Sequence, residues 1–204
     1  MTPQPHEDEP RARTRRFLHG FLDEDAGAAR AVLDGALAPG CDWEMSCPFG
    51  RLDGSAGVWE GFLGPLRAAL SGARRRDEIV IGGWNRRAAG GYWVAAVTHY
   101  LGNFAAPLLG IPPSGHLAFL RSGEFYRLGA DGRIEQARLI LDLPDLMRQA
   151  GAMPFPFPYG LETMFPGPAT HDGVLPSEGD GRRSLDIVEG MLADLQAYDP
   201  LTLA

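Results

Sequence analysis

The chain has 204 residues, of which 45% are hydrophobic and 22% charged, a composition typical of a globular domain with short extensions. Its formal net charge of −7 argues against a nucleic-acid-binding protein. Its 19 basic residues are all arginine, which excludes chemistry through a Schiff-base lysine or a P-loop lysine.

The sequence carries no signal for secretion or membrane insertion. Residues 1–13 contain charges without a following apolar core, so we expect a disordered lead-in rather than a secretory signal. No stretch reaches the roughly 18 consecutive apolar residues of a membrane-spanning helix. We therefore expect a cytoplasmic protein that has no membrane partner.

Helices dominate the first third of the chain. Spaced phenylalanines predict a helix over 14–22, and a second helix follows Asp25 as N-cap and stops at Pro39-Gly40. Partial alternation predicts a first strand over 41–49. Apolar residues spaced by three and four predict a third helix over 53–71.

Four strands follow in the second half of the domain. The run Arg74-Arg75-Arg76 is interpreted as a solvated turn. The strands are predicted over 78–84, 92–104, 116–128 and 133–141, before a short helix over 143–150. Helices that gather early and strands that gather late indicate an α+β fold, with helices on one face of a bent antiparallel sheet. Such a sheet forms a cone whose interior is lined by alternate side chains.

The two cysteines are predicted to be free. Cys41 and Cys47 lie six residues apart in one predicted strand, which separates them by about 20 Å, beyond disulfide reach. No further ligands lie nearby in register, so we predict no metal site and two buried thiols.

The C-terminal part differs in composition. Residues 152–183 are rich in proline, glycine and aromatic residues and are interpreted as a linker or arm. Residues 184–204 contain an amphipathic helix with Ser184 as N-cap. This helix either docks, for example on a partner subunit of a homodimer, or begins a truncated second copy of the domain.

Within 14–151, several short motifs occur in order and resemble those of a known family. They are H-x-x-G-x-F from His99, G-x-P-x-S-G from Gly110, Tyr126-Arg127, Asp131-Gly132, and D-x-x-x-L-x-x-Q-x-G from Asp142. The set resembles the SnoaL-like polyketide cyclases, of the superfamily of nuclear transport factor 2 and scytalone dehydratase. The resemblance implies a cone-shaped α+β barrel and an intramolecular aldol cyclisation of a polyketide ester. It also implies an acid/base aspartate, matched by Asp142, with neither metal nor cofactor.

Asp142 has two open interpretations. It either caps the helix that follows or lies in an apolar pocket, where burial raises a carboxyl pKa and suits acid/base chemistry. Period two places Arg138 and Gln136 on its strand face. The family commonly has an aromatic residue in place of Arg138. This arginine either pairs with Asp142, binds a substrate carboxylate or enolate, or faces solvent.

Each of the other candidate residues also has an interpretation in which it has only a structural role. His99 matches the family histidine, but a strand histidine is often only hydrogen-bonded. Glu124 and Tyr126 share a strand face, where Tyr126 could bind a substrate carbonyl and Glu124 could lie near Arg138; an exposed face is the alternative. Trp59 lies on the apolar stripe of the third helix and is either core or cavity wall.

These observations predict a cofactor-independent small-molecule enzyme acting on a carbonyl substrate. Its predicted catalytic residues are Asp142 and His99, and its predicted substrate-binding residues are Arg138, Tyr126, Glu124, Trp59 and Gln136. The alternatives are a non-catalytic ligand-binding or dimerisation module of the same fold and one half of a tandem protein.

Overall fold

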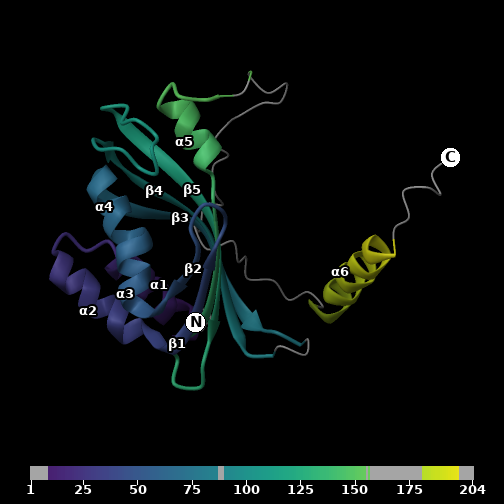
Figure 1. Cartoon of the computed structure of the whole chain (residues 1–204). Helices are drawn as coiled ribbons and strands as arrows, with labels where there is room; N and C mark the ends of the chain where they lie inside the picture. The colour runs from purple at the N-terminus through teal and green to yellow at the C-terminus, as the bar shows by residue number, and fades with distance from the viewer. Residues whose placement is uncertain (1–8, 87–89, 155, 157–180, 198–204) are drawn as a thin grey trace, which may run out of the picture. The chain divides into compact units, whose positions relative to one another are not determined.

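The computed structural model describes residues 9–86, 90–154, 156 and 181–197, which fall in two compact units, Met1–Val174 and Leu175–Ala204. In chain order the elements of the first unit are α1 (Glu9–Gly20), α2 (Ala26–Ala36), β1 (Leu37–Met45), β2 (Gly50–Asp53), α3 (Gly54–Val58), the π-helix η1 (Trp59–Leu63), α4 (Gly64–Ala69), β3 (Leu70–Trp84), β4 (Tyr92–Phe104), β5 (Leu117–Leu128), β6 (Ile134–Leu141) and α5 (Leu143–Gln149) (Figure 1).

The strands form one curved, open sheet in the order β2-β1-β6-β5-β4-β3. All neighbouring strands are antiparallel except β1 and β6, which are parallel. Helices α1 to α4 lie together on one side of this sheet (Figure 1). The predicted α+β fold is therefore confirmed.

One face of the sheet is covered and the other is more exposed. Along β5, Leu120, Ser122, Glu124 and Tyr126 are buried, whereas Arg121 and Phe125 between them are exposed. On β6 the covered positions are Ala137, Leu139 and Leu141. The largest fully buried side chains pack on this covered face or within the helices, and include Trp43, Phe62, Phe104 and Tyr126.

Helix boundaries follow local signals with some differences. Asp25 caps α2 as predicted, because its carboxylate accepts a hydrogen bond from Ala28 N at 2.7 Å. The predicted helix over 53–71 forms as α3, η1 and α4 in succession. Pro39-Gly40, where the second helix was predicted to stop, lies inside β1, and Gly40 adopts a positive φ of 73° there. The strand β2 was not predicted.

The interpretation of Arg74-Arg75-Arg76 as a solvated turn is wrong. The run lies within β3, a continuous strand that begins at Leu70. Alternation turns Arg75 to the covered face, where it is buried, and leaves Arg74 and Arg76 exposed. A bulge between Asp77 and Ile79 then shifts the register with β4.

The second unit contains α6 (Gly181–Gln196), and Ser184 lies inside this helix rather than at its N-cap. Its apolar side chains are exposed at Ile187, Val188, Met191, Leu192 and Leu195. Most of the predicted arm over 152–183 and residues 1–8 of the predicted lead-in lie outside the described residues. Helix α1 begins at Glu9, earlier than the predicted residue 14. None of the helices described is both long and apolar enough to cross a bilayer.

The two cysteines differ in environment. Cys41 is buried in β1, whereas Cys47 follows the strand and is exposed, so the prediction of two buried thiols is wrong for Cys47. Burial, with the nearby Asp42 carboxylate, raises the pKa of Cys41 to about 11. Among the described residues, no cluster of three His, Cys, Asp or Glu side chains is placed to hold a metal ion.

These environments predict selective thiol chemistry. At neutral pH, Ellman's reagent should react with the exposed Cys47 and spare Cys41, which is inaccessible and protonated. Cys47→Ser should remove the native-state reaction, and denaturation should expose Cys41. Equal reaction rates for both thiols in the folded protein would contradict the buried position of Cys41.

Candidate functional site

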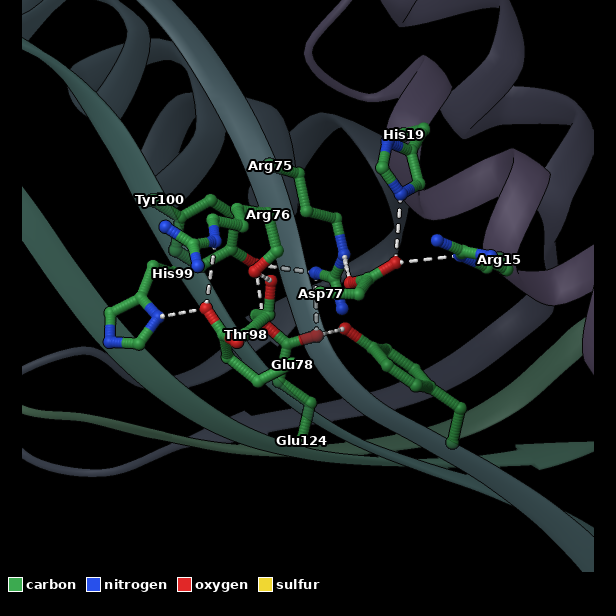
Figure 2. A network of polar contacts seen from close by, with 11 residues as sticks. Arg15, His19, Arg75, Arg76, Asp77, Glu78, Thr98, His99, Tyr100 and Glu124 are labelled. Carbon is green, nitrogen blue, oxygen red and sulfur yellow. Dashed lines mark hydrogen bonds and ion pairs between the residues drawn. The ribbon is translucent and has the colours of Figure 1, made fainter. Parts of the chain in front are cut away.

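A cluster of polar side chains lies on the covered face of the sheet and is centred on Glu124 of β5. We call Arg75, Asp77, Tyr100, Glu124 and Tyr126 the interior cluster (Figure 2). Glu124 Oε2 accepts hydrogen bonds from Arg75 Nη1 at 2.7 Å and from Tyr126 Oη at 2.8 Å. Glu124 Oε1 accepts one from Tyr100 Oη at 2.6 Å. The cluster thus joins β3, β4 and β5 through one carboxylate.

Asp77 connects the interior cluster to helix α1. Its Oδ1 accepts from Arg75 Nε at 2.6 Å. Its Oδ2 lies 2.8 Å from His19 Nε2 and accepts from Arg15 Nε at 3.0 Å. Figure 2 shows both helix residues meeting Asp77 from one side. The Asp77 side chain is wholly buried, whereas those of Arg15 and His19 are nearly half exposed, so the network runs from the surface of α1 to the centre of the sheet.

Burial and charge set the protonation of the cluster. Burial, reinforced by the neighbouring Glu124 carboxylate, raises the pKa of Tyr100 and of Tyr126 well above the ordinary value. Burial opposes the charge of Arg75, but Glu124 and its other neighbours raise the pKa of this guanidinium well above normal. At neutral pH both tyrosines are therefore neutral hydrogen-bond donors and Arg75 is a cation.

Asp77 remains ionised although it is buried. Burial alone would raise the pKa of Asp77, but the hydrogen bond from His19 and the charge of Arg75 hold it far below its ordinary value. The sheet interior therefore contains two acidic side chains around one arginine, with a second arginine at the rim.

Three buried donor atoms on this face have no hydrogen-bond partner within the described part of the chain. They are Arg75 Nη2, Ser122 Oγ and Trp43 Nε1. Ser122 precedes Glu124 by two residues on the same strand face, and the Trp43 ring centroid lies 6.0 Å from that of Tyr126.

Asp142, the predicted acid/base, lies outside the interior cluster. It is the N-cap of α5, where its Oδ1 accepts from Asp145 N at 3.1 Å, and its Oδ2 accepts from Arg121 Nη2 at 2.7 Å. Arg121 projects from the uncovered face of β5. Of the two interpretations left open by the sequence, the structure favours the helix cap.

Arg138 pairs with another aspartate. Its guanidinium forms an ion pair with Asp42 on β1 and donates to the Asp42 carbonyl oxygen at 2.8 Å. The hydrogen bond from Arg138 to the Asp42 carboxylate lowers the pKa of Asp42. The suggested pairing of Arg138 with Asp142 and the suggested proximity of Glu124 to Arg138 are both wrong. Gln136 and Arg138 lie on the uncovered face of β6, because the covered positions are 137, 139 and 141.

His99 and Trp59 also lie apart from the interior cluster. His99 pairs in register with Arg121, which places it on the uncovered face, and its Nδ1 lies 3.4 Å from Glu78 Oε1. Burial lowers the pKa of His99, so the ring is neutral at pH 7. Trp59 is half-buried on the helical layer, with the Arg30 and Arg67 guanidinium groups 5.3 and 5.6 Å from its ring.

The structure therefore unites two of the predicted site residues, Glu124 and Tyr126, with three that sequence reasoning missed. The missed residues are Arg75, Asp77 and Tyr100. A signal for Arg75 and Asp77 exists in the run R-R-R-D-E over 74–78, which alternates charges between strand faces once it is interpreted as β-structure.

Helices packed on one face of a curved, open six-stranded sheet define the fold of the SnoaL-like polyketide cyclases, as comparison with solved structures shows. No protein-family model and no curated protein sequence matches the chain. The structural likeness confirms the fold that the sequence motifs predicted.

Three solved structures illustrate this likeness. A protein from Jannaschia sp. CCS1 described as a SnoaL-like polyketide cyclase superimposes with a TM-score of 0.57 at 19% identity, over 76% of this chain and 100% of its own. IdmH from Streptomyces antibioticus, described as a polyketide cyclase, gives 0.56 at 19% identity, over 70% of this chain and 99% of its own. TsrD from Streptomyces laurentii superimposes with a TM-score of 0.55 at 21% identity, over 70% of this chain and 97% of its own. At these identities the likeness establishes the fold alone.

The Asp77 environment predicts that acid destabilises the protein. The folded pKa of Asp77 lies below the ordinary value of 3.8, so the unfolded chain binds its proton first as the pH falls. The stability supplied by Asp77 is thus complete above about pH 5 and is lost progressively below it. Urea unfolding followed by circular dichroism from about pH 6 to about pH 3 should show this loss.

The variant Asp77→Asn distinguishes the contribution of Asp77 to this pH dependence from the contributions of other carboxylates. Asp77→Asn should lose about 3–5 kcal/mol at about pH 6, because it leaves Arg75 short of a buried partner, and its stability should depend less on pH. Glu60→Gln, at an exposed helix position, should behave like the wild type. An unchanged pH slope in Asp77→Asn would contradict this assignment.

Proposed function

We propose that this chain is a small-molecule enzyme of the SnoaL-like type in which Glu124 is the acid/base carboxylate. It acts on a carbonyl substrate by removing a proton from the carbon next to the carbonyl, the step that begins an aldol cyclisation or an isomerisation. The observation that carries the proposal is a wholly buried carboxylate, held by two tyrosines and an arginine in the apolar interior of this fold.

The two oxygen atoms of Glu124 differ in their capacity to accept a proton. A carboxylate oxygen has two lone-pair sites. Oε2 accepts from both Arg75 and Tyr126, whereas Oε1 accepts only from Tyr100 among the described contacts. Oε1 therefore retains an acceptor site, and it is the atom proposed to take the substrate proton.

The remaining members of the interior cluster have supporting roles. Tyr100 and Tyr126 keep their protons at neutral pH and fix the orientation of the carboxylate. Arg75 is a fixed positive charge beside Glu124, and it would stabilise the enolate that proton removal creates. Asp77 holds Arg75 in place through its Nε.

A non-catalytic ligand-binding module of the same fold is the second candidate. It is favoured by the position of Asp142, because the carboxylate that matches the family aspartate is bonded to a helix N-terminus and to Arg121. The expected homodimer and the tandem-domain interpretation remain predictions.

Deuterium exchange into 2-tetralone, a flat uncharged ketone, tests the proposed function. Wild-type protein in D₂O should accelerate exchange at the carbons beside the carbonyl, followed by proton NMR. Glu124→Gln should lower this rate about 100-fold or more, as expected for loss of a general base. Tyr126→Phe, which keeps the ring and removes one donor to Glu124, should lower it less.

Asp142→Asn is the matched comparison, because it neutralises the carboxylate that sequence motifs favoured. Its exchange rate should equal that of the wild type, with a modest loss of thermal stability from the weaker helix cap. If Asp142→Asn abolishes exchange while Glu124→Gln, shown to be folded by circular dichroism, retains it, the assignment to Glu124 is wrong. Absence of exchange by the wild type would favour the binding-module candidate.

A further inference from the structure

The helix α6 presents an apolar face that is exposed in the structure. The helix, yellow in Figure 1, has 16 residues, all of them described, and none of them is buried. Isolated helices of about 15 residues are marginal in water, and Gly190 in the middle weakens this one further, so a partner on the apolar face would stabilise it. The apolar side chains repeat at three and four residues and are between 40% (Leu192) and 64% (Ile187) exposed; they belong to Ile187, Val188, Met191, Leu192 and Leu195.

The charges at the two ends of α6 oppose its own dipole. Arg182 and Arg183 lie in the first turn, where the helix dipole is positive, and Asp194 lies near the last residue, where the dipole is negative. The first turn has no acidic residue and the last turn has no basic one. This arrangement destabilises the helix alone, so a neighbour that supplies the opposite charges at both ends would stabilise it.

A second α6 in the antiparallel orientation supplies those charges. Its acidic end would lie beside the basic end of the first helix, and the two dipoles would then oppose each other favourably. Arg183 and Asp194 are separated by about three turns, so they border the same edge of the apolar face. In an antiparallel pair the same edges meet, which would place each Arg183 near Asp194 of the other helix. The pattern is therefore complementary to itself under a two-fold axis, whereas a parallel pair would place like charges together.

The length of α6 limits the strength of such a contact. A 16-residue helix is about 24 Å long and about 10 Å wide, so one face offers less area than the roughly 800 Å² that each partner contributes to a standard interface. We expect weak association, with a dissociation constant in the micromolar range, rather than an obligate dimer.

We propose that α6 is a self-association helix, which pairs with α6 of a second copy of this chain in the antiparallel orientation. Val188, Leu192 and Leu195 form the apolar seam. Arg183 forms an ion pair with Asp194 of the partner subunit at each end. The proposal is independent of the chemistry assigned to Glu124.

Sedimentation velocity of the full chain at concentrations from about 1 to about 500 μM measures the association. The wild type should pass from monomer to dimer over this range. Leu192→Asp should remain monomeric, because it places a charge in the apolar seam. Ala193→Asp is the matched control, since Ala193 is exposed on the polar side of α6, and it should associate like the wild type.

Charge exchange tests the orientation. Arg183→Glu and Asp194→Arg each suit the dipole of α6 itself, so neither should weaken the isolated helix. Each should nevertheless raise the dissociation constant about 5-fold, because two opposite-charge contacts become like-charge contacts. The double variant restores both pairs and should regain at least the wild-type affinity.

Crosslinking reports the orientation directly. Arg183→Cys and Asp194→Cys chains, each carrying Cys47→Ser to remove the exposed thiol, are mixed and treated with a short bismaleimide. The mixture should give crosslinked dimers, and each chain alone should give few. Efficient crosslinking of each chain alone would indicate a parallel pair and reject the proposal.

Three further outcomes would overturn the self-association proposal. They are a wild type that stays monomeric across the concentration range, unchanged association of Leu192→Asp, and a double charge variant that associates no better than the single ones. A monomeric wild type that loses thermal stability in Leu192→Asp would assign the apolar face of α6 to a contact within its own chain instead.

Discussion

The ion pair between Arg75 and Glu124 is the constraint on which the rest of the interior depends. Both side chains are buried, so two charges leave water at a cost of several kcal/mol each, which their mutual attraction offsets only with good geometry and further hydrogen bonds. Tyr100, Tyr126 and Asp77 supply those bonds. Arg15 and His19 of α1 complete the network at Asp77, so the same pair that holds the interior cluster together also links a helix to the sheet.

The fold class could be predicted from the sequence because the signals for its helices and strands are local. The strand predicted over 92–104 has the same bounds as β4, and Asp25 caps α2 because Ser, Asp and similar residues satisfy free amides at helix starts. β2 and the parallel pairing of β1 with β6 could not be predicted this way, because no local pattern encodes which distant strand becomes a neighbour.

The site was predicted only in part, because the covered face of a strand is decided by packing. On β6 either the face of Arg138 or the face of Leu139 could have lined the interior, and the helices cover the second. The run Arg74-Arg75-Arg76 was interpreted as a solvated turn, yet β3 divides these charges between its two faces. Arg75 and Asp77 enter the interior cluster, while Glu78 lies near His99 on the other side. Glu124 and Tyr126 were found because both lie on one face of a plainly alternating strand.

The parallel contact between β1 and β6 has a consequence for how the chain reaches its native state. Arg138 donates to the carbonyl oxygen of Asp42 across 96 residues of sequence, so β1 cannot find its place until nearly the whole domain has been synthesised. The hairpin-connected strands β3 to β6 have shorter loops to close and can assemble first. During translation, the edge of β1 that pairs with β6 therefore lacks its partner until β6 emerges, and an unpaired strand edge favours aggregation during this interval.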